Sequence, residues 1–164
     1  MYSEKFLRRA IELSTIARDR TGHEPFGAVV VRNGRIVGEG INRSALSHDP
    51  TSHGETEAIR DACRRLETVD LSGCQLYTSC EPCALCVATM VITGISELYY
   101  AAGLAQANEA LSQVPPGIRF PVDAERLRTE CGKPVGDRAI PSGQALAEDA
   151  TEIIRAWASA VIGP

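Results

Sequence analysis

Apolar residues near the start of the chain are spaced first as in a helix and then as in strands. Between residues 4 and 17 they recur every three or four positions, which predicts an amphipathic helix. Residues 26–31 and 36–41 are rich in β-branched and other apolar side chains. The dipeptide Asn33-Gly34 stands between them and favours a two-residue hairpin turn, because both central residues need positive φ. This part of the chain therefore predicts a helix followed by an antiparallel pair of strands.

Helix and strand patterns alternate over the next segment. Residues 42–52 are polar and contain Asp49-Pro50, which predicts a loop. The elements predicted beyond this loop are a helix from His53 or Gly54 to Leu66, a strand over 75–79, a helix over 84–92 opened by Pro82 and Cys83, and a strand over 97–102. This alternation predicts a layered α/β sandwich with a mixed sheet.

The rest of the chain is less regular. After Gly103, prolines divide the sequence into short pieces without a clear period. Apolar residues from Leu146 to Val161 then form one stripe at helical spacing, which predicts a last helix that packs on another surface, such as a second subunit. The length of 164 residues predicts a single domain over 1–164, with a core over 1–103 and a C-terminal extension over 104–164.

Composition narrows the functional classes. Apolar residues make up 44% and charged residues 23% of the chain, as in ordinary globular proteins. The net charge of −4 offers no positive field to polyanions, so tight nucleic-acid binding is not expected. Because no apolar run could span a bilayer and no export signal is visible, we expect a cytoplasmic protein with no membrane partner. Its six cysteines are then better interpreted as metal ligands or buried thiols than as disulfides.

Two short motifs place metal-binding side chains at the starts of predicted helices. They are His53-Gly54-Glu55 and Pro82-Cys83-Ala84-Leu85-Cys86. One imidazole and two thiolates give Zn²⁺ three protein ligands and leave a fourth position for water, as in catalytic zinc sites. Glu55 is too close to His53 along the chain to be a natural further ligand, but it can reach that water and transfer protons. Cys80 leaves an alternative open, a closed structural site in which it is the fourth ligand.

The two motifs together, H-x-E and P-C-x-x-C, form the signature of zinc-dependent base deaminases. Further stretches agree with these enzymes in the same order: residues 24–31, Asn42-Arg43, 48–51 and 76–83. On these motifs the chain, from about residue 24 to 103, resembles the cytidine deaminase-like superfamily, and within it the bacterial guanine deaminases. The resemblance implies a three-layer α/β/α sandwich with a mixed sheet of about five strands and helices on both faces.

The resemblance also implies a site and a reaction. One Zn²⁺ per subunit would be bound by His53, Cys83 and Cys86. Glu55 would move protons while water displaces ammonia from a free nucleobase or related amino-heterocycle, with guanine as the first candidate. Cytosine, isocytosine, modified purines and s-triazines are the other candidates. The implied substrate contacts are the side chains of Asn42 and Phe26 and backbone groups of Gly54, Glu81 and Cys83. A homodimer is implied as well, with the C-terminal extension closing the pocket of its own or the other subunit.

Two departures from the guanine deaminase pattern bear on the substrate. Guanine deaminases usually resemble one another in a His-Ala-Glu motif, and this chain has His53-Gly54-Glu55 there, with glycine in place of alanine. The segment after Gly103 matches no tail of the family. Two other functions stay open. One is deamination of adenosine in tRNA, although residues 104–164 carry 6 basic and 8 acidic side chains, a net charge of −2 that does not favour RNA. The other is a non-catalytic protein stabilised by the closed Cys₃His site.

Overall fold

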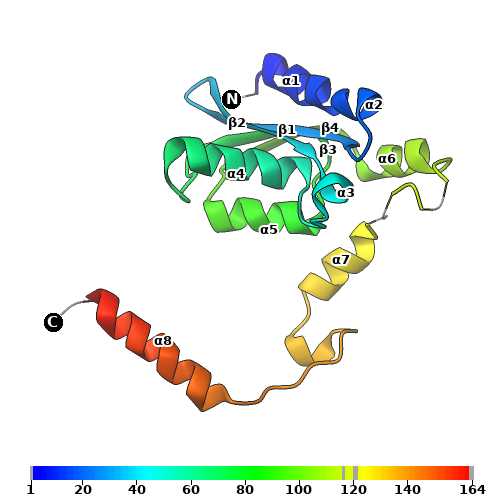
Figure 1. Ribbon diagram of the computed structural model, residues 1–164. Helices are drawn as coiled ribbons and strands as arrows, with labels where there is room; N and C mark the ends of the chain where they lie inside the picture. Colours follow the sequence, from blue (N-terminus) through cyan, green and yellow to red (C-terminus); the bar gives the residue numbers. More distant parts are fainter. Residues whose placement is uncertain (1, 116, 120–121, 163–164) are drawn as a thin grey trace. The chain divides into compact units, whose positions relative to one another are not determined.

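The structure, a computed structural model, describes residues 2–115, 117–119 and 122–162 and contains two compact units. One unit ends at Arg128 and holds the sheet with its covering helices, and the other begins at Thr129 (Figure 1). Among the described residues, no helix has the length and apolar character needed to cross a membrane. The single domain over 1–164 stays a prediction.

The sheet is mixed, as predicted. Its strands are β1 (Glu24–Arg32), β2 (Arg35–Asn42), β3 (Gln75–Cys80) and β4 (Glu97–Ala102), in the order β2-β1-β3-β4. β1 runs antiparallel to β2 and β3, whereas β3 and β4 are parallel. The expected number of about five strands was wrong. In the part of the chain that the structure describes there are four, because the segment after Gly103 forms helices and irregular backbone instead.

Helices cover both faces of this sheet, which confirms the α/β/α layering (Figure 1). α1 (Glu4–Ser14) and α2 (Ile16–Asp19) lie on one face, and α4 (Gly54–Leu66) and α5 (Ala84–Thr93) lie on the other. Successive side chains of a strand point to opposite faces, and β1 is apolar on both. Its Val29 and Val31 join the core with α1, while Ala28 and Val30 join the core with α4.

The connections around β2 position the later site. Asn33 and Gly34, with φ of 52° and 71°, make the predicted turn between β1 and β2. β2 ends at Asn42, and the predicted polar loop follows, with one short helical turn, α3 (Ser44–Ser47). The loop leads directly into α4 at His53. Asn42 and His53 therefore stand at the two ends of one loop.

Helices α6 (Leu104–Leu111), α7 (Ala124–Cys131) and α8 (Ala147–Ile162) follow β4, with a 3₁₀ turn at Val135–Asp137 before α8. The apolar pattern predicted only α8. Neither α6 nor α7 has a buried residue, so neither needs the apolar stripe by which a helix is found in sequence. α8 has that stripe, yet its large apolar side chains are exposed.

Candidate functional site

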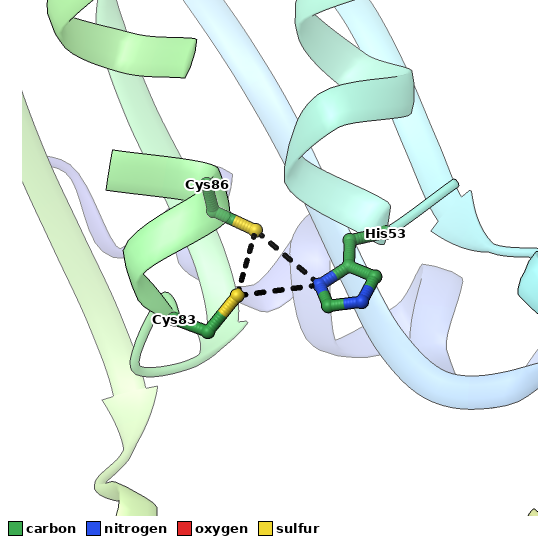
Figure 2. Close-up of side chains that lie close together, drawn as sticks. All are labelled: His53, Cys83 and Cys86. Atoms are coloured by element: carbon green, nitrogen blue, oxygen red, sulfur yellow. Dashed lines mark hydrogen bonds between the residues drawn. The ribbon is translucent and has the colours of Figure 1, made fainter. Parts of the chain in front are cut away.

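Two helix starts converge and bring three candidate metal ligands together (Figure 2). His53 is the N-cap residue of α4, Cys83 is the N-cap residue of α5, and Cys86 lies in the first turn of α5. Unpaired N–H groups and the helix dipole favour negative charge at such positions, and so favour thiolates. Pro82 precedes the N-cap of α5 and lies two residues before the first helical residue, Ala84, so the predicted placement of this proline at the first helical position was wrong.

The three donor atoms have the spacing of a tetrahedral zinc site. The Sγ atoms of Cys83 and Cys86 lie 3.7 Å apart, and each lies 3.5 Å from Nδ1 of His53 (Figure 2). Zn–S bonds of about 2.3 Å and Zn–N bonds of about 2.0–2.1 Å, at tetrahedral angles, separate two sulfurs by about 3.8 Å and sulfur from nitrogen by about 3.6 Å. The residues present therefore fit Zn²⁺ with three protein ligands.

The same cluster gathers negative charge that a cation would balance. Hydrogen bonds from Cys86 and then His53 lower the pKa of the Cys83 thiol to about 4. The pKa of Cys86 is raised, first by its hydrogen bond to Cys83 and then by burial and the neighbouring carboxylate of Glu55. The hydrogen bond to Cys83 also raises the pKa of His53. A bound divalent cation would allow both sulfurs to be thiolates at once.

Glu55 lies beside this cluster as a buried carboxyl group. It is only 4% exposed, and burial raises its pKa. Its Oε1 accepts a hydrogen bond from Oγ1 of Thr78 at 3.1 Å, and its Oε2 accepts one from Sγ of Cys86 at 3.4 Å. Thr78, on β3, therefore orients the carboxyl group toward the metal ligands. A buried carboxyl group with a raised pKa is suited to hold and release a proton.

Cys80 lies outside the ligand cluster. Among the described residues, the only His, Cys, Asp and Glu side chains whose donor atoms come together as a possible metal site are His53, Cys83 and Cys86. Burial, and then the charge of Glu55, raise the pKa of Cys80 to about 11, so its thiol stays protonated. This geometry argues against the closed Cys₃His alternative and leaves a coordination position open.

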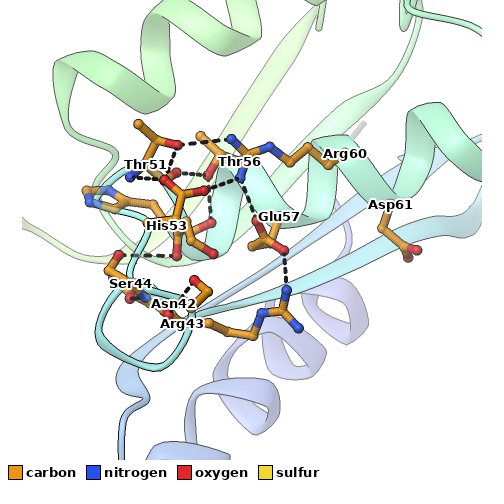
Figure 3. A network of polar contacts seen from close by, with 12 residues as sticks. Asn42, Arg43, Ser44, Thr51, His53, Thr56, Glu57, Arg60 and Asp61 are labelled. Carbon is orange, nitrogen blue, oxygen red and sulfur yellow. Dashed lines mark hydrogen bonds and ion pairs between the residues drawn. The ribbon is translucent and has the colours of Figure 1, made fainter.

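A network of hydrogen bonds and ion pairs holds the loop between β2 and α4, which ends at His53 (Figure 3). The backbone N–H and the hydroxyl of Thr51 both donate to Oδ1 of Asp49, at 2.8 and 2.6 Å. Arg60, on α4, donates to the Thr51 hydroxyl at 3.0 Å and to Glu57 at 2.6 Å. Of these contacts, the bond from Arg60 to Thr51 joins the loop to α4. The orientation of the His53 backbone is therefore set before any metal binds.

The other end of the loop fixes Asn42. Its side chain is 4% exposed, and its Oδ1 accepts a hydrogen bond from the N–H of Ser44 at 3.0 Å (Figure 3). The N–H of Arg43 donates to the carbonyl of Ser52 at 3.0 Å, which closes the loop at its base. Because the Asn42 oxygen is used in this way, its amide nitrogen is the group left to donate to a ligand.

Gly54 has a steric reason to be glycine. A Cβ atom at this position would lie 2.4 Å from the carbonyl oxygen of Phe26, which is backbone and cannot swing aside. α4 therefore starts in close contact with β1. A larger residue at position 54 would push Phe26 away from the start of α4 and so away from His53. The departure from alanine, noted from the sequence, thus reflects packing between the helix start and the strand.

A cavity of about 350 Å³ opens in front of the ligands. The predicted site residues that line it are Phe26, Asn42, His53, Glu55, Glu81 and Cys83. Cys86 and Gly54 are not among its lining residues, and both are buried. Glu81 has a further contact, because its Oε2 accepts a hydrogen bond from the N–H of Leu104 at 3.1 Å. This bond connects the start of α6 to the segment between β3 and α5.

Sequence reasoning missed other residues of this wall. They include Glu24, His48, Asn108 and Arg119, and behind the wall lies Thr78, the partner of Glu55. Asn108 lies on α6 and Arg119 in the proline-rich segment, where no periodicity shows which side chains point inward. Glu24 directly precedes the Pro25-Phe26 pair, and this position next to a predicted pocket residue was the one usable signal.

Comparison with known families agrees with this geometry. Residues 1–102 match the family described as the cytidine and deoxycytidylate deaminase zinc-binding region. The chain belongs to this deaminase family. Zinc is accordingly the metal for which His53, Cys83 and Cys86 are arranged, and the matched region contains all three together with Glu55.

Two guanine deaminases are similar to this deaminase beyond the matched region. The guanine deaminase of Bacillus subtilis is 37% identical over 157 residues, which cover 96% of this chain and 94% of that enzyme. Its X-ray structure superposes with a TM-score of 0.80 over the same shares of both chains. A structure of the guanine deaminase from Nitrosomonas europaea superposes with a TM-score of 0.60, at 28% identity, over 78% of this chain and 72% of that one.

Similarity to tRNA enzymes covers less of the deaminase. The tRNA-specific adenosine deaminase of Aquifex aeolicus is 38% identical over 102 residues, which cover 62% of this chain and 67% of that enzyme. Identity is thus about the same in both comparisons, and the difference lies in the length over which it extends. The part of this chain that follows β4 has a counterpart in the guanine deaminase, so the expectation that the segment after Gly103 matches no tail of the family was wrong.

Proposed function

We propose that this deaminase hydrolyses the amino group of a free nucleobase or related amino-heterocycle, guanine first, to a carbonyl group with release of ammonia. The observation that carries the proposal is the extent of similarity: the relation to guanine deaminase includes the residues after β4 that wall the cavity. The relation to the tRNA enzyme covers 62% of the chain. Cytosine, isocytosine, modified purines and s-triazines are the further substrates to test.

The proposed reaction needs metal-binding residues and a residue that transfers protons. His53, Cys83 and Cys86 would hold Zn²⁺, which when bound acidifies water and makes a nucleophile available near neutral pH. Glu55 takes the proton of the attacking water on a carboxylate oxygen and returns it to the departing amino group, which leaves as ammonia. Thr78 keeps the Glu55 carboxylate turned toward the reacting carbon through its bond to Oε1.

Substrate contacts come from around the cavity. We assign the amide nitrogen of Asn42 as a donor to a ring acceptor, because its oxygen is already bound to Ser44. Phe26 is half-buried in the cavity wall and offers an apolar face to a flat ring. The backbone N–H of Gly54 and the carbonyl of Glu81 are assigned to the reacting part of the ring and to the leaving ammonia.

The decisive experiment compares wild type with Glu55→Gln on guanine, cytosine, isocytosine, adenine, ammeline, 8-oxoguanine and the matching nucleosides. We expect ammonia release from one or more free bases, and a loss of about 10²- to 10⁴-fold in kcat for Glu55→Gln with zinc content unchanged. Glu67→Gln, an exposed carboxyl group at the end of α4, is the matched control and should keep full activity. Zinc-loaded wild type that releases ammonia from none of these compounds would disprove the proposal.

Deamination of tRNA is the rival function within the family. The chain after Gly103 has a net charge of −2, whereas phosphate contacts require cationic surface. We therefore expect no gel shift with tRNA at low salt. Tight binding there, together with inosine formation in the bound tRNA, would reverse the assignment.

We also infer that the protein is a homodimer. α8 exposes the apolar side chains of Ile153, Ile154, Trp157 and Val161, each at least 60% exposed. A stripe of this kind is costly to leave in water and is typically covered by another protein surface. The proposed partner is a second copy, and light scattering should give twice the mass of one chain. The C-terminal extension over 104–164 would then close the pocket of its own or the partner subunit.

A further inference from the structure

A charged pair stands in the cavity wall apart from the metal ligands. Nε of Arg119 donates to Oε2 of Glu24 at 3.0 Å, and the two side chains are only 22% and 17% exposed. Both residues line the cavity. The pair joins the start of β1 to a segment far along the chain, so it brings a guanidinium group to the cavity wall and holds it against the sheet.

The pair leaves unused hydrogen-bonding atoms in a fixed orientation. Among the described residues, Nε is the one nitrogen of the Arg119 guanidinium that has a hydrogen-bond partner. The two Nη groups are therefore free to donate, and the planar guanidinium fixes their directions once Nε is bound. Glu24 pairs with Asn42 in the β1–β2 register, so Arg119 is anchored next to the cavity residue whose amide nitrogen we assign as another donor to the substrate.

The charge of Glu24 determines what these donors can bind. A phosphate or carboxylate on the substrate would approach the guanidinium with the carboxylate of Glu24 beside it, and like charges repel. A neutral ligand with two acceptors meets no such penalty. The O6 and N7 atoms of guanine are such a pair, and an arginine binds them with two parallel hydrogen bonds.

We infer that Arg119, held by Glu24, is a specificity-determining residue that binds the O6/N7 edge of a 6-oxopurine. The inference rests on the proposed function. Adenine presents N7 beside an amino group, which would place donor against donor at Arg119. The residue would thus favour guanine-type substrates over aminopurines without taking part in the chemical step.

The test removes one acceptor from the base and the donors from the protein. We would measure kcat/KM on guanine and on 7-deazaguanine, in which C–H replaces N7, for wild type, Arg119→Met and the control Arg126→Met, an exposed arginine on α7. An arginine–guanine pair is worth about 1–3 kcal/mol, or about 5- to 150-fold. Wild type and the control should prefer guanine within that range, mainly through KM, and Arg119→Met should bring the ratio near 1.

The outcomes separate the two proposals. If wild type hydrolyses guanine and Arg119→Met keeps the wild-type ratio, the role of Arg119 is disproved while the proposed function stands. If wild type hydrolyses no base, the proposed function is disproved and this inference with it. If Arg119→Met does not fold, Glu24→Gln is the second variant, because it removes the charge that anchors Arg119. It must then lower the ratio of kcat/KM on guanine to kcat/KM on 7-deazaguanine. Guanosine monophosphate is assayed alongside the two bases, and if Arg119→Met lowered kcat/KM for this nucleotide alone, Arg119 would be assigned to a phosphate and the inference overturned.

Discussion

The first compact unit buries its apolar side chains, whereas helix α8 in the second exposes them. Val29 and Val30 of β1 are completely buried between two layers of helices, while Ile153 and Trp157 of α8 are 72% and 66% exposed. The first unit therefore contains a finished core, and α8 has the surface of a helix that packs on a partner.

A second contrast runs along the chain at the end of β4. All three candidate zinc ligands and Glu55 lie before that point, in the region that matches the deaminase family. Part of the cavity wall, including α6 and Arg119, lies after it. The metal centre is thus a property of the shared core, and we attribute the choice of substrate to the wall built by the later residues. The following variants test this division.

The largest effect is expected from Cys86→Ser. Removing one of three zinc ligands should abolish both zinc binding and ammonia release, because the fourth position belongs to water rather than to protein. Zinc content by mass spectrometry and activity on the best base are the measurements. Cys80→Ser is the matched control and should keep stoichiometric zinc. Loss of zinc from Cys80→Ser would support the closed structural site, in which Cys80 is the fourth ligand. It would also contradict the division between a catalytic metal centre in the core and a substrate choice made by the residues after β4.

A smaller effect is expected from Gly54→Ala. The added Cβ would lie 2.4 Å from the Phe26 carbonyl, so α4 and β1 must separate. We expect a decrease of about 1–3 kcal/mol in the free energy of unfolding, measured with urea, and a rise in KM as Phe26 moves. Gly143→Ala serves as the control, since no atom lies within 4 Å of its added Cβ. Equal stability of the two variants would contradict the steric account of Gly54.

Trp157→Glu addresses the exposed helix. A charge in the apolar stripe of α8 should shift the molar mass by light scattering from two chains to one, because the partner surface can no longer cover it. The free energy of unfolding of the first unit should change by less than about 0.5 kcal/mol, as for other exposed positions. Glu152→Gln, a polar exposed position of the same helix, should keep the dimer. A monomeric wild type would refute the proposed homodimer directly.

The smallest effect concerns a surface pair in the core unit. Oε1 and Oε2 of Glu39 accept hydrogen bonds from Arg9 at 2.8 and 3.0 Å, and these bonds lower the pKa of Glu39 below 4.5. The pair therefore stabilises the fold fully above the unfolded pKa, and this stabilisation is lost as the pH falls through the lower folded pKa. Glu39→Gln should cost at most about 1 kcal/mol near pH 7 and almost nothing in strong acid. Urea unfolding at both pH values measures this, and an equal cost at the two would be inconsistent with it.

The sequence predicted the core elements well because their signals are local. The paired strands around Asn33-Gly34, the helix starts at His53 and Cys83, and the ligand spacing all depend on neighbours along the chain. The helix starts matter most, since each places a ligand at a helix N-terminus, where the helix dipole favours the thiolates of Cys83 and Cys86. The extra strand came from the resemblance alone, because the sequence patterns themselves located four strands, the number that the described residues form.

The sequence by itself determined which three side chains are the candidate metal ligands, which carboxyl group lies near them, and the alternation of strands and helices that builds a layered sandwich. Only the tertiary structure decided that Cys80 stands outside the metal cluster, that Thr78 orients Glu55, and that Arg119 meets Glu24 across 95 positions of sequence. The physical reason is the range of the interactions. Periodicity, turns and helix caps are set within a few residues, whereas a cavity wall forms where distant segments pack, and no local pattern records which side chains will face each other there.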